Sequence, residues 1–255
     1  MIKNNFFKTK WVALLATLVF FMFLTSYTKS KNKFQNDITR IKFISSLPLF
    51  TNNNEFVNYK DSIGIVYFKN QILYELSDVY TSHNLDTLHN SSVIVKREIR
   101  HRYLLFAKKE FYGYYYDSLN VVNGRKVAVD SFLNKRAFGG YSIFNKLENH
   151  ILLSSITTQG NYTLIEKYKC KEKKDYTYPD TTFVYYTNQM KEVVHTLSKE
   201  LDTNKKMKVK KIRALYNPQI VEGNSVPSHE IIFELKEDTI TNLDKYKLFI
   251  EKHKK

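Results

Sequence analysis

The sequence predicts a β-rich α+β fold, built mostly from antiparallel strands that are joined by short hairpins. Apolar and polar residues alternate with period two through several stretches, most clearly over 93–107. This alternation is typical of a sheet that has one face on a core and the other in water. Two-residue turn signals, Lys69-Asn70 and Asn123-Gly124, separate pairs of such stretches. Both observations favour a meander of hairpins.

An apolar stretch over 11–27 follows a lead that contains Lys3, Lys8 and Lys10. A basic lead before an apolar core is typical of a secretory signal or a signal anchor. The uninterrupted apolar part, 11–24, is shorter than the roughly 20 residues of a spanning helix, and no A-x-A cleavage motif follows it. A cleaved signal peptide and an uncleaved anchor over 1–28 therefore both remain open. Either one predicts a location outside the cytoplasm of a bacterium: periplasmic, membrane-anchored or secreted.

The charge of the chain restricts its expected partners. Its 255 residues contain 40 Lys and Arg against 25 Asp and Glu, a net charge of +15, and most of the cations are lysines. Proteins that read nucleic acid depend strongly on arginine, so nucleic acid is not an expected partner. A basic surface attracts anionic envelope polymers and lipids. These, or a protein, are the partner classes that we expect.

Residues 29–60 are interpreted as a basic tether followed by a short helix. Ile38, Ile41, Ile44 and Leu47 recur at helical spacing, and Pro48 would end the helix. A single β-rich domain is expected over 61–255.

The first half of that domain reads as successive strands. The stretch 63–76 predicts a hairpin about Lys69-Asn70, and 77–92 is polar and loop-like. A long strand is expected over 93–107, a turn over 108–110 and a returning strand over 111–116.

The second half mixes strands with helices. Strands are expected on both sides of Asn123-Gly124 and over 141–144, 151–156, 162–169, 181–186 and 230–235. Helices are expected over 131–138, over 188–201, where apolar residues recur at i, i+3, i+4, i+7 and i+11, and from Thr241 to the C-terminus. The stretch 207–216 fits a strand or a helix, with the strand favoured.

Two sets of residues are candidates for binding. The tyrosines of the returning strand, Tyr112, Tyr114 and Tyr116, can form a platform for carbohydrate or peptide. The arginines of the long strand, Arg97, Arg100 and Arg102, can form an anion-binding edge. Each set has a structural alternative: sheet packing for the tyrosines, and a solvated face for the arginines.

No catalytic, metal or nucleotide motif is apparent. The seven histidines have neither metal-ligand spacing among themselves nor a zinc pattern with the single cysteine, Cys170. P-loop, G-x-G-x-x-G and G-x-S-x-G motifs are missing from the sequence. We therefore expect no cofactor and no metal, and favour a non-enzymatic binding or structural module over an enzyme. The alternative is a hydrolase whose site joins His101 or His195 to a distant carboxylate and serine.

A short C-terminal pattern resembles a known family. Tyr216-Asn217-Pro218, then Gly223, Val226 and Phe233, is similar to the tail of TonB-type energy-transducer domains, with Tyr in place of that family's Trp and a shorter gap before the closing strand. The resemblance implies a second alternative, a periplasmic interaction domain at the C-terminus.

Overall fold

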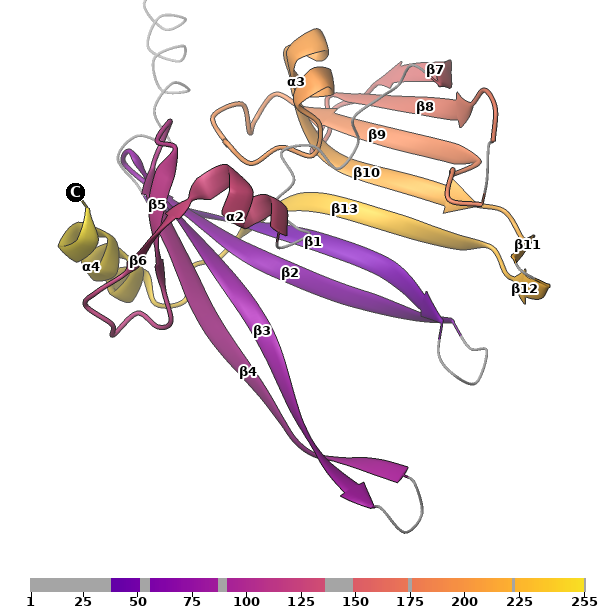
Figure 1. Cartoon of the computed structure of the whole chain (residues 1–255). Helices are drawn as coiled ribbons and strands as arrows, with labels where there is room; N and C mark the ends of the chain where they lie inside the picture. The colour runs from indigo at the N-terminus through magenta and orange to yellow at the C-terminus, as the bar shows by residue number, and fades with distance from the viewer. Residues whose placement is uncertain are drawn as a thin grey trace, which may run out of the picture.

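The computed structural model describes residues 38–50, 56–86, 91–135, 149–173, 176–221 and 223–254. The expected signal or anchor over 1–28 lies outside these residues. Within the described part of the chain, no helix has the length and apolar character needed to cross a membrane. The dominant element is one antiparallel sheet of eleven strands (Figure 1), so the β-rich α+β class is confirmed.

The first six strands form a meander in chain order, each antiparallel to the next. They are β1 (Thr39–Phe50), β2 (Phe56–Phe68), β3 (Gln71–Asp86), β4 (Ser91–Ala107), β5 (Tyr112–Tyr116) and β6 (Arg125–Ala128). The hairpin about Lys69-Asn70 is confirmed, and Lys69 adopts the left-handed backbone (φ 54°) that this turn requires.

The last strand of the chain joins the two halves of the sheet, because it pairs with β1 on one side and with β10 on the other. The order beyond β1 is β13 (His229–Asp238), β10 (Lys208–Tyr216), β9 (Thr181–Thr187), β8 (Leu164–Cys170) and β7 (His150–Thr157). A separate small hairpin of β11 (Gln219–Val221) and β12 (Asn224–Val226) follows β10. The preferred strand over 207–216 is thus confirmed.

Both faces of the sheet carry a core. On the face that we call inner, residues from β1–β5 and β8–β10 pack with α2 (Val129–Lys135), α3 (Lys199–Lys205) and the segment before α3. On the outer face, α4 (Leu243–His253) packs on residues of β2–β5. The C-terminal helix is confirmed. The expectation that 93–107 has one wet face is wrong near its end, since Tyr103 and Leu104 are both buried on opposite faces.

The short helix expected between residues 37 and 47 is wrong, because this stretch is β1. Its whole length pairs with β2, from Thr39 opposite Tyr67 to Phe50 opposite Phe56. Ile41 and Phe43, two residues apart, enter the inner core. Pro48 is tolerated because it lies beyond the part of β1 that pairs with β13. The backbone hydrogen bonds of β1 to β2 and β13 stabilise the strand more than the apolar residues at every third position stabilise a helix.

The helix expected over 188–201 is also wrong, since helical structure begins only at Lys199. The preceding residues form turns and extended backbone, although Met190 and Leu197 are buried as predicted. Side chains satisfy the irregular backbone: the amide of His195 donates to the hydroxyl of Tyr67, 3.4 Å away. The apolar spacing therefore marks burial, not helix.

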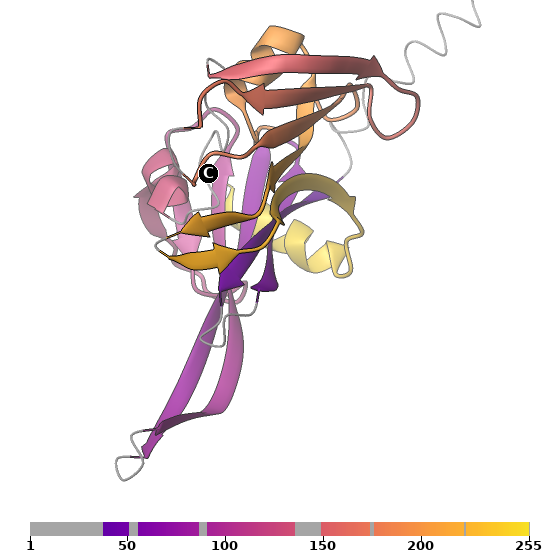
Figure 2. The same ribbon diagram turned by 90° about the vertical axis from the view of Figure 1, so that its right-hand side faces the viewer.

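Two expected turns have a different structure. The loop expected over 77–92 is largely strand, because β3 runs to Asp86 and β4 starts at Ser91; this hairpin projects from the body (Figure 2). Asn123-Gly124 does not form a two-residue hairpin, since β6 pairs with β5 across a longer connection. The expected strand over 141–144 lies outside the described residues, and the helix expected over 131–138 is described as far as Lys135.

Candidate functional site

The three candidate tyrosines share the outer face of β5 but differ in exposure. Tyr116 is only 3% exposed and packs its ring on Phe249 of α4, with ring centroids 5.0 Å apart. Tyr114 is half-buried. Tyr112 is 57% exposed, and the ammonium of Lys126 lies 4.6 Å from the centre of its ring. The exposure of these three tyrosines therefore increases along β5 from Tyr116 in the core to Tyr112 at the surface.

Tyr114 and Tyr116 line a hollow of about 420 Å³ between β5 and α4, which we call the β5–α4 hollow. Its other lining residues are Val122, Asn123, Gly124, Lys252 and His253. None of the lining residues is acidic. A Cβ added at Gly124 would lie 2.6 Å from ring atoms of Tyr116, so glycine is required for this shape.

The polar groups of the β5–α4 hollow suit an anionic or hydroxyl-rich ligand. Lys252 supplies an ammonium group with three hydrogen-bond donors, and two phenol hydroxyls can donate or accept. Burial raises the pKa of Tyr116, followed in importance by the charge of Tyr114, so its hydroxyl stays protonated. Nδ1 of His253 lies 2.9 Å from the carbonyl oxygen of Phe249 and donates to it. The other nitrogen, Nε2, is buried with no hydrogen-bond partner among the described residues.

The candidate arginines have carboxylate partners close by. Arg100 forms an ion pair with Glu98 (3.0 Å) and lies over the ring of Tyr80. Arg102 forms an ion pair with Asp78 (3.1 Å). The side chain of Arg97 is outside those that the structure describes. Because these guanidinium groups are matched by acids, the β5–α4 hollow offers an anion the more favourable field.

His101 lies near a serine and a carboxylate, but not in a relay geometry. Its Nδ1 is 3.3 Å from Oγ of Ser77 and 3.6 Å from Oε1 of Glu75. In a Ser–His–carboxylate relay the serine and the acid contact different ring nitrogens. Here both approach the same nitrogen, and Glu75 also accepts hydrogen bonds from Arg40 (2.7 Å) and Tyr246 (2.9 Å). This network ties β1, β3 and α4 together.

His195 is buried in the inner core. Its Nδ1 lies 3.0 Å from the hydroxyl of Tyr74, and its ring contacts Phe43 with centroids 5.1 Å apart. Burial, and secondarily the charge of Lys208, lowers the pKa of His195 to about 3. A neutral ring without solvent access cannot serve a hydrolase as an acid–base group.

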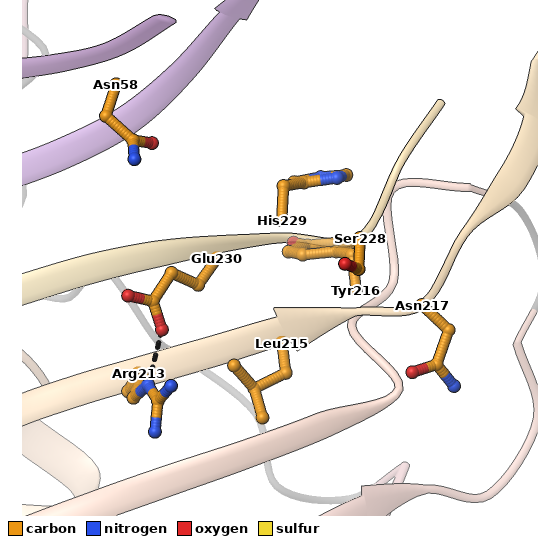
Figure 3. Close-up of a pocket in the computed structure, with 8 residues that line it drawn as sticks. All are labelled: Asn58, Arg213, Leu215, Tyr216, Asn217, Ser228, His229 and Glu230. Atoms are coloured by element: carbon orange, nitrogen blue, oxygen red, sulfur yellow. Dashed lines mark hydrogen bonds and ion pairs between the residues drawn. The ribbon is translucent and has the colours of Figure 1, made fainter. Parts of the chain in front are cut away.

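A second groove, of about 390 Å³, lies where β10 ends and β13 begins (Figure 3). The rings of Tyr216 and His229 stack there in nearly parallel planes, 4.6 Å apart. The only cation of its lining, Arg213, forms an ion pair with Glu230 at 2.5 Å. This groove therefore has no uncompensated cation for an anion.

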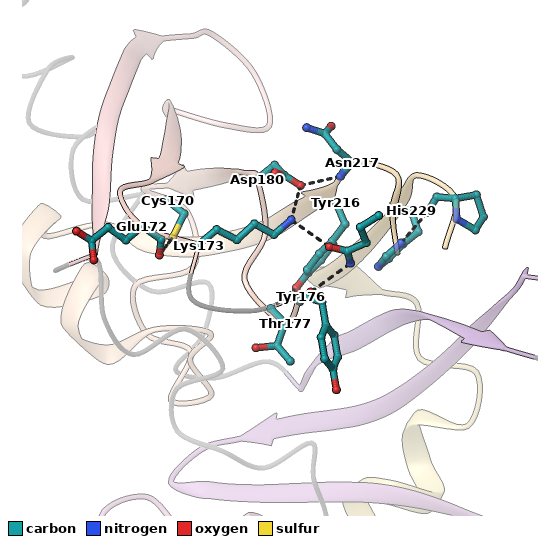
Figure 4. Close-up of polar contacts among 11 residues, drawn as sticks. Cys170, Glu172, Lys173, Tyr176, Thr177, Asp180, Tyr216, Asn217 and His229 are labelled. Carbon is teal, nitrogen blue, oxygen red and sulfur yellow. Dashed lines mark hydrogen bonds and ion pairs between the residues drawn. The ribbon is translucent and has the colours of Figure 1, made fainter. Parts of the chain in front are cut away.

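The TonB-like residues beside this groove hold a loop in place (Figure 4). The hydroxyl of Tyr216 donates to the carbonyl oxygen of Thr177 (3.1 Å). The amide of Asn217 donates to the carboxylate of Asp180 (2.7 Å), which also accepts from Lys173 (3.1 Å). These contacts give Tyr216 and Asn217 a local structural role.

Comparison with known proteins gives no family assignment. No family model matches the sequence, and no curated protein matches it. One solved structure with some likeness is a LolA superfamily protein from Nitrosomonas europaea, which is 8% identical; the alignment covers 86% of this chain and 94% of that one. Its TM-score of 0.23 is too low to indicate a common fold, so no function is inferred from it.

Sequence reasoning missed one buried polar cluster. Glu166 on β8 is 1% exposed and accepts hydrogen bonds from Tyr168 (2.5 Å), Tyr186 (2.9 Å) and Lys205 (2.5 Å). Burial alone would raise the pKa of Glu166, but these three donors hold it below its ordinary value. The sequence could have indicated this cluster, because Glu166 and Tyr168 are two residues apart on a strand and therefore share one face. Within the described ranges, no group of three His, Cys, Asp or Glu could hold a metal ion.

Proposed function

We propose that this chain is an exported envelope protein, anchored by its N-terminal apolar stretch, that binds an anionic polymer without converting it. The observation that carries the proposal is the β5–α4 hollow, which combines aromatic rings, Lys252 and His253 with no lining carboxylate. The net charge of +15 favours approach of a polyanion.

The chemistry of the hollow favours a polymer of sugar rings that carry carboxylate or phosphate groups. Tyrosine rings can pack on the apolar faces of sugars, and their hydroxyls can bind sugar hydroxyl groups. The ammonium of Lys252 can form charge-assisted hydrogen bonds with the anionic groups. Tyr112 and Lys126 extend the same face of β5 beyond the hollow, so a chain of several sugars would find further contacts.

The proposed binding can be tested with the full chain in a nonionic detergent. Isothermal titration would compare an acidic polysaccharide, polygalacturonate, with neutral dextran of similar length. We expect binding to polygalacturonate only, with an affinity that falls as salt rises. Lys252→Ala should weaken it about tenfold, and Gly124→Ala should weaken it by closing the hollow against Tyr116. Lys199→Ala, which removes an exposed lysine of α3, is the matched control and should leave binding unchanged.

Equal binding of both polysaccharides, or binding that Lys252→Ala and Lys199→Ala weaken equally, would exclude the hollow as the site. Equal binding of both polysaccharides would mean that the charge of the ligand does not determine binding. Equal weakening by the two variants would mean that binding depends on the overall charge of the chain.

Export can be tested separately by fusing alkaline phosphatase, which is active only outside the cytoplasm, to the C-terminus in a bacterial host. We expect phosphatase activity from the full-length fusion and its loss when residues 1–28 are deleted. Equal activity with and without residues 1–28 would contradict the proposed role of that stretch.

A further inference from the structure

The start of β1 and two turns that contain lysines, Lys69-Asn70 and Lys108-Lys109, lie at the same end of the large sheet. We call this end the entry end. Thr39 lies opposite Tyr67, two residues before the turn at Lys69-Asn70. The next turn is adjacent, because the amide of Lys108 donates to the carbonyl oxygen of Asn70 (2.7 Å). The β11–β12 hairpin lies at the opposite end (Figure 1).

The entry end exposes apolar side chains among cations. Phe111, which directly follows the second turn, is 78% exposed, and Leu248 on α4 is 71% exposed. Lys109 and Lys247 are exposed as well. Lys69 is 3.8 Å from Glu251, so part of the positive charge at this end is compensated. Exposed aromatic and aliphatic residues next to lysines are typical of surfaces that meet lipid head groups.

The length of chain before β1 limits how far this end can lie from a membrane. Ten residues, 28–37, separate the apolar stretch 11–27 from Ile38. Even fully extended they reach only roughly 35 Å. The twelve residues of β1 place its other end roughly 40 Å further away. If residues 11–27 are anchored in a membrane, the linker is short enough for the entry end to contact the bilayer. With β1 perpendicular to the bilayer, the β11–β12 end is too far away for contact.

We propose that the entry end docks on an anionic bilayer, with Phe111 at the depth of the lipid head groups and the turn lysines facing lipid phosphates. This inference rests on the membrane anchoring in the proposed function. Lysine attraction to an anionic surface acts only within about one Debye length, roughly 8 Å at physiological salt. Docking therefore requires the contact that the short tether makes possible.

The test uses the full chain in nanodiscs made of brominated phosphatidylglycerol or brominated phosphatidylcholine, since bromine quenches nearby tryptophan. Trp11 is the only tryptophan, and its quenching in both lipids reports anchoring. In a Trp11→Phe background, Phe111→Trp places the reporter at the entry end. Ile220→Trp in the same background is the matched control, because Ile220 is equally exposed (78%) at the opposite end.

We expect at least about twofold quenching of the tryptophan at position 111 in the anionic lipid, much less in the zwitterionic lipid, and none at position 220 in either. Adding Lys69→Glu and Lys109→Glu should abolish the quenching at 111. Docking is overturned, with anchoring intact, if Trp11 is quenched while position 111 is not, or if positions 111 and 220 are quenched equally. Equal quenching of position 111 in both lipids overturns the requirement for anionic lipid. Absence of Trp11 quenching overturns the anchoring itself, and docking with it.

Discussion

At the scale of single residues, the structure buries three ionisable side chains, Glu166, Lys208 and His195, and accommodates each in a different way. Glu166 keeps its charge because three donors surround it. Lys208 is buried, which lowers its pKa, but its ion pair with Asp202 (2.9 Å) opposes that shift. Among the described residues, the ring of His195 has one hydrogen-bonding contact, with the hydroxyl of Tyr74, and the ring stays neutral. Such groups make stability depend on pH, because the unfolded chain titrates them normally.

Because His195 is buried as a neutral ring, acid should destabilise the folded chain. Its pKa is about 3 in the folded chain and roughly 6.5 when unfolded. Below pH 6.5 the unfolded chain therefore binds a proton that the folded chain does not, and stability falls as the pH falls towards 3. Between pH 7 and pH 5 this single group should lower the free energy of unfolding by about 2 kcal/mol.

Urea unfolding at the two pH values, compared with His195→Gln, measures this contribution. The variant loses the ring contacts with Phe43 and should be less stable at pH 7, but its stability should change less with pH. If both proteins have the same pH dependence, His195 is accessible to protons in the folded state.

At the scale of elements, helix and strand ends show where the chain adopts strained backbone. Three lysines, Lys69, Lys109 and Lys206, have left-handed φ values at turns or caps. Lys206 ends α3 with φ 53°, and its amide donates to the carbonyl oxygen of Thr203. Glycine is the residue that occupies such a C-terminal position without strain.

We therefore expect Lys206→Gly to stabilise the protein by about 0.5–1 kcal/mol, because it relieves the left-handed strain of a side-chain-bearing residue. Lys199→Gly, at the first position of the same helix, is the matched control and should destabilise by a similar amount, since no strain is relieved there and glycine disfavours helix. Thermal unfolding of both variants measures the two effects. A loss of stability in Lys206→Gly would show that the lysine side chain contributes more than the strain costs.

At the scale of the whole molecule, burial is distributed unevenly along the sheet. β3 and β4 pair throughout their length, from Gln71 opposite Ala107 to Asp86 opposite Ser91. Among the side chains of this hairpin that the structure describes, those near Ile72 and Phe106 lie in a core, whereas Val79 and Ile99 are exposed. At Val79 and Ile99 the hairpin therefore lies outside the core, where strand pairing is joined by polar contacts such as the ion pair of Arg102 with Asp78.

Hydrogen exchange should reveal this gradient. We expect amides of 72–76 and 102–106 to exchange at least about a hundredfold more slowly than those near Val79 and Ile99, since the strands can open there without exposing a core. Peptide-resolved mass spectrometry of the exchanged chain measures it. Uniform protection along both strands would contradict the prediction and indicate that the outer hairpin is stabilised by packing.

Local patterns predicted the strands whose signals lie within one hairpin. Lys69-Asn70 and the flanking alternation were sufficient for the parts of β2 and β3 next to the turn, 63–68 and 71–76, because a tight turn sets the pairing register. The same reasoning failed for β1 and for 188–198. There the apolar spacing suits more than one backbone conformation, and the choice depends on distant partners: β2 and β13 for β1, and Tyr67 for His195.

The candidate site was predictable only in part. Tyr114 and Tyr116 stood out as an unusual run of tyrosines on one strand face. Nothing in the sequence indicated that Lys252 and His253 would complete the hollow beside them. The partner of Arg100, Glu98, is two residues away in the sequence. The partner of Arg102, Asp78, is distant in the sequence and comes close because β3 pairs with β4.

The sequence by itself determined the β-rich class, the hairpin about Lys69-Asn70 and the C-terminal helix, because alternation, turn chemistry and helical periodicity act between near neighbours. The tertiary structure decided that β13 joins the two halves of the sheet and that α4 covers β5. Those contacts depend on groups far apart in the chain, such as Tyr246 and Glu75, which are 171 residues apart. Burial of a shared apolar face, and not any local preference, selects which distant segments meet.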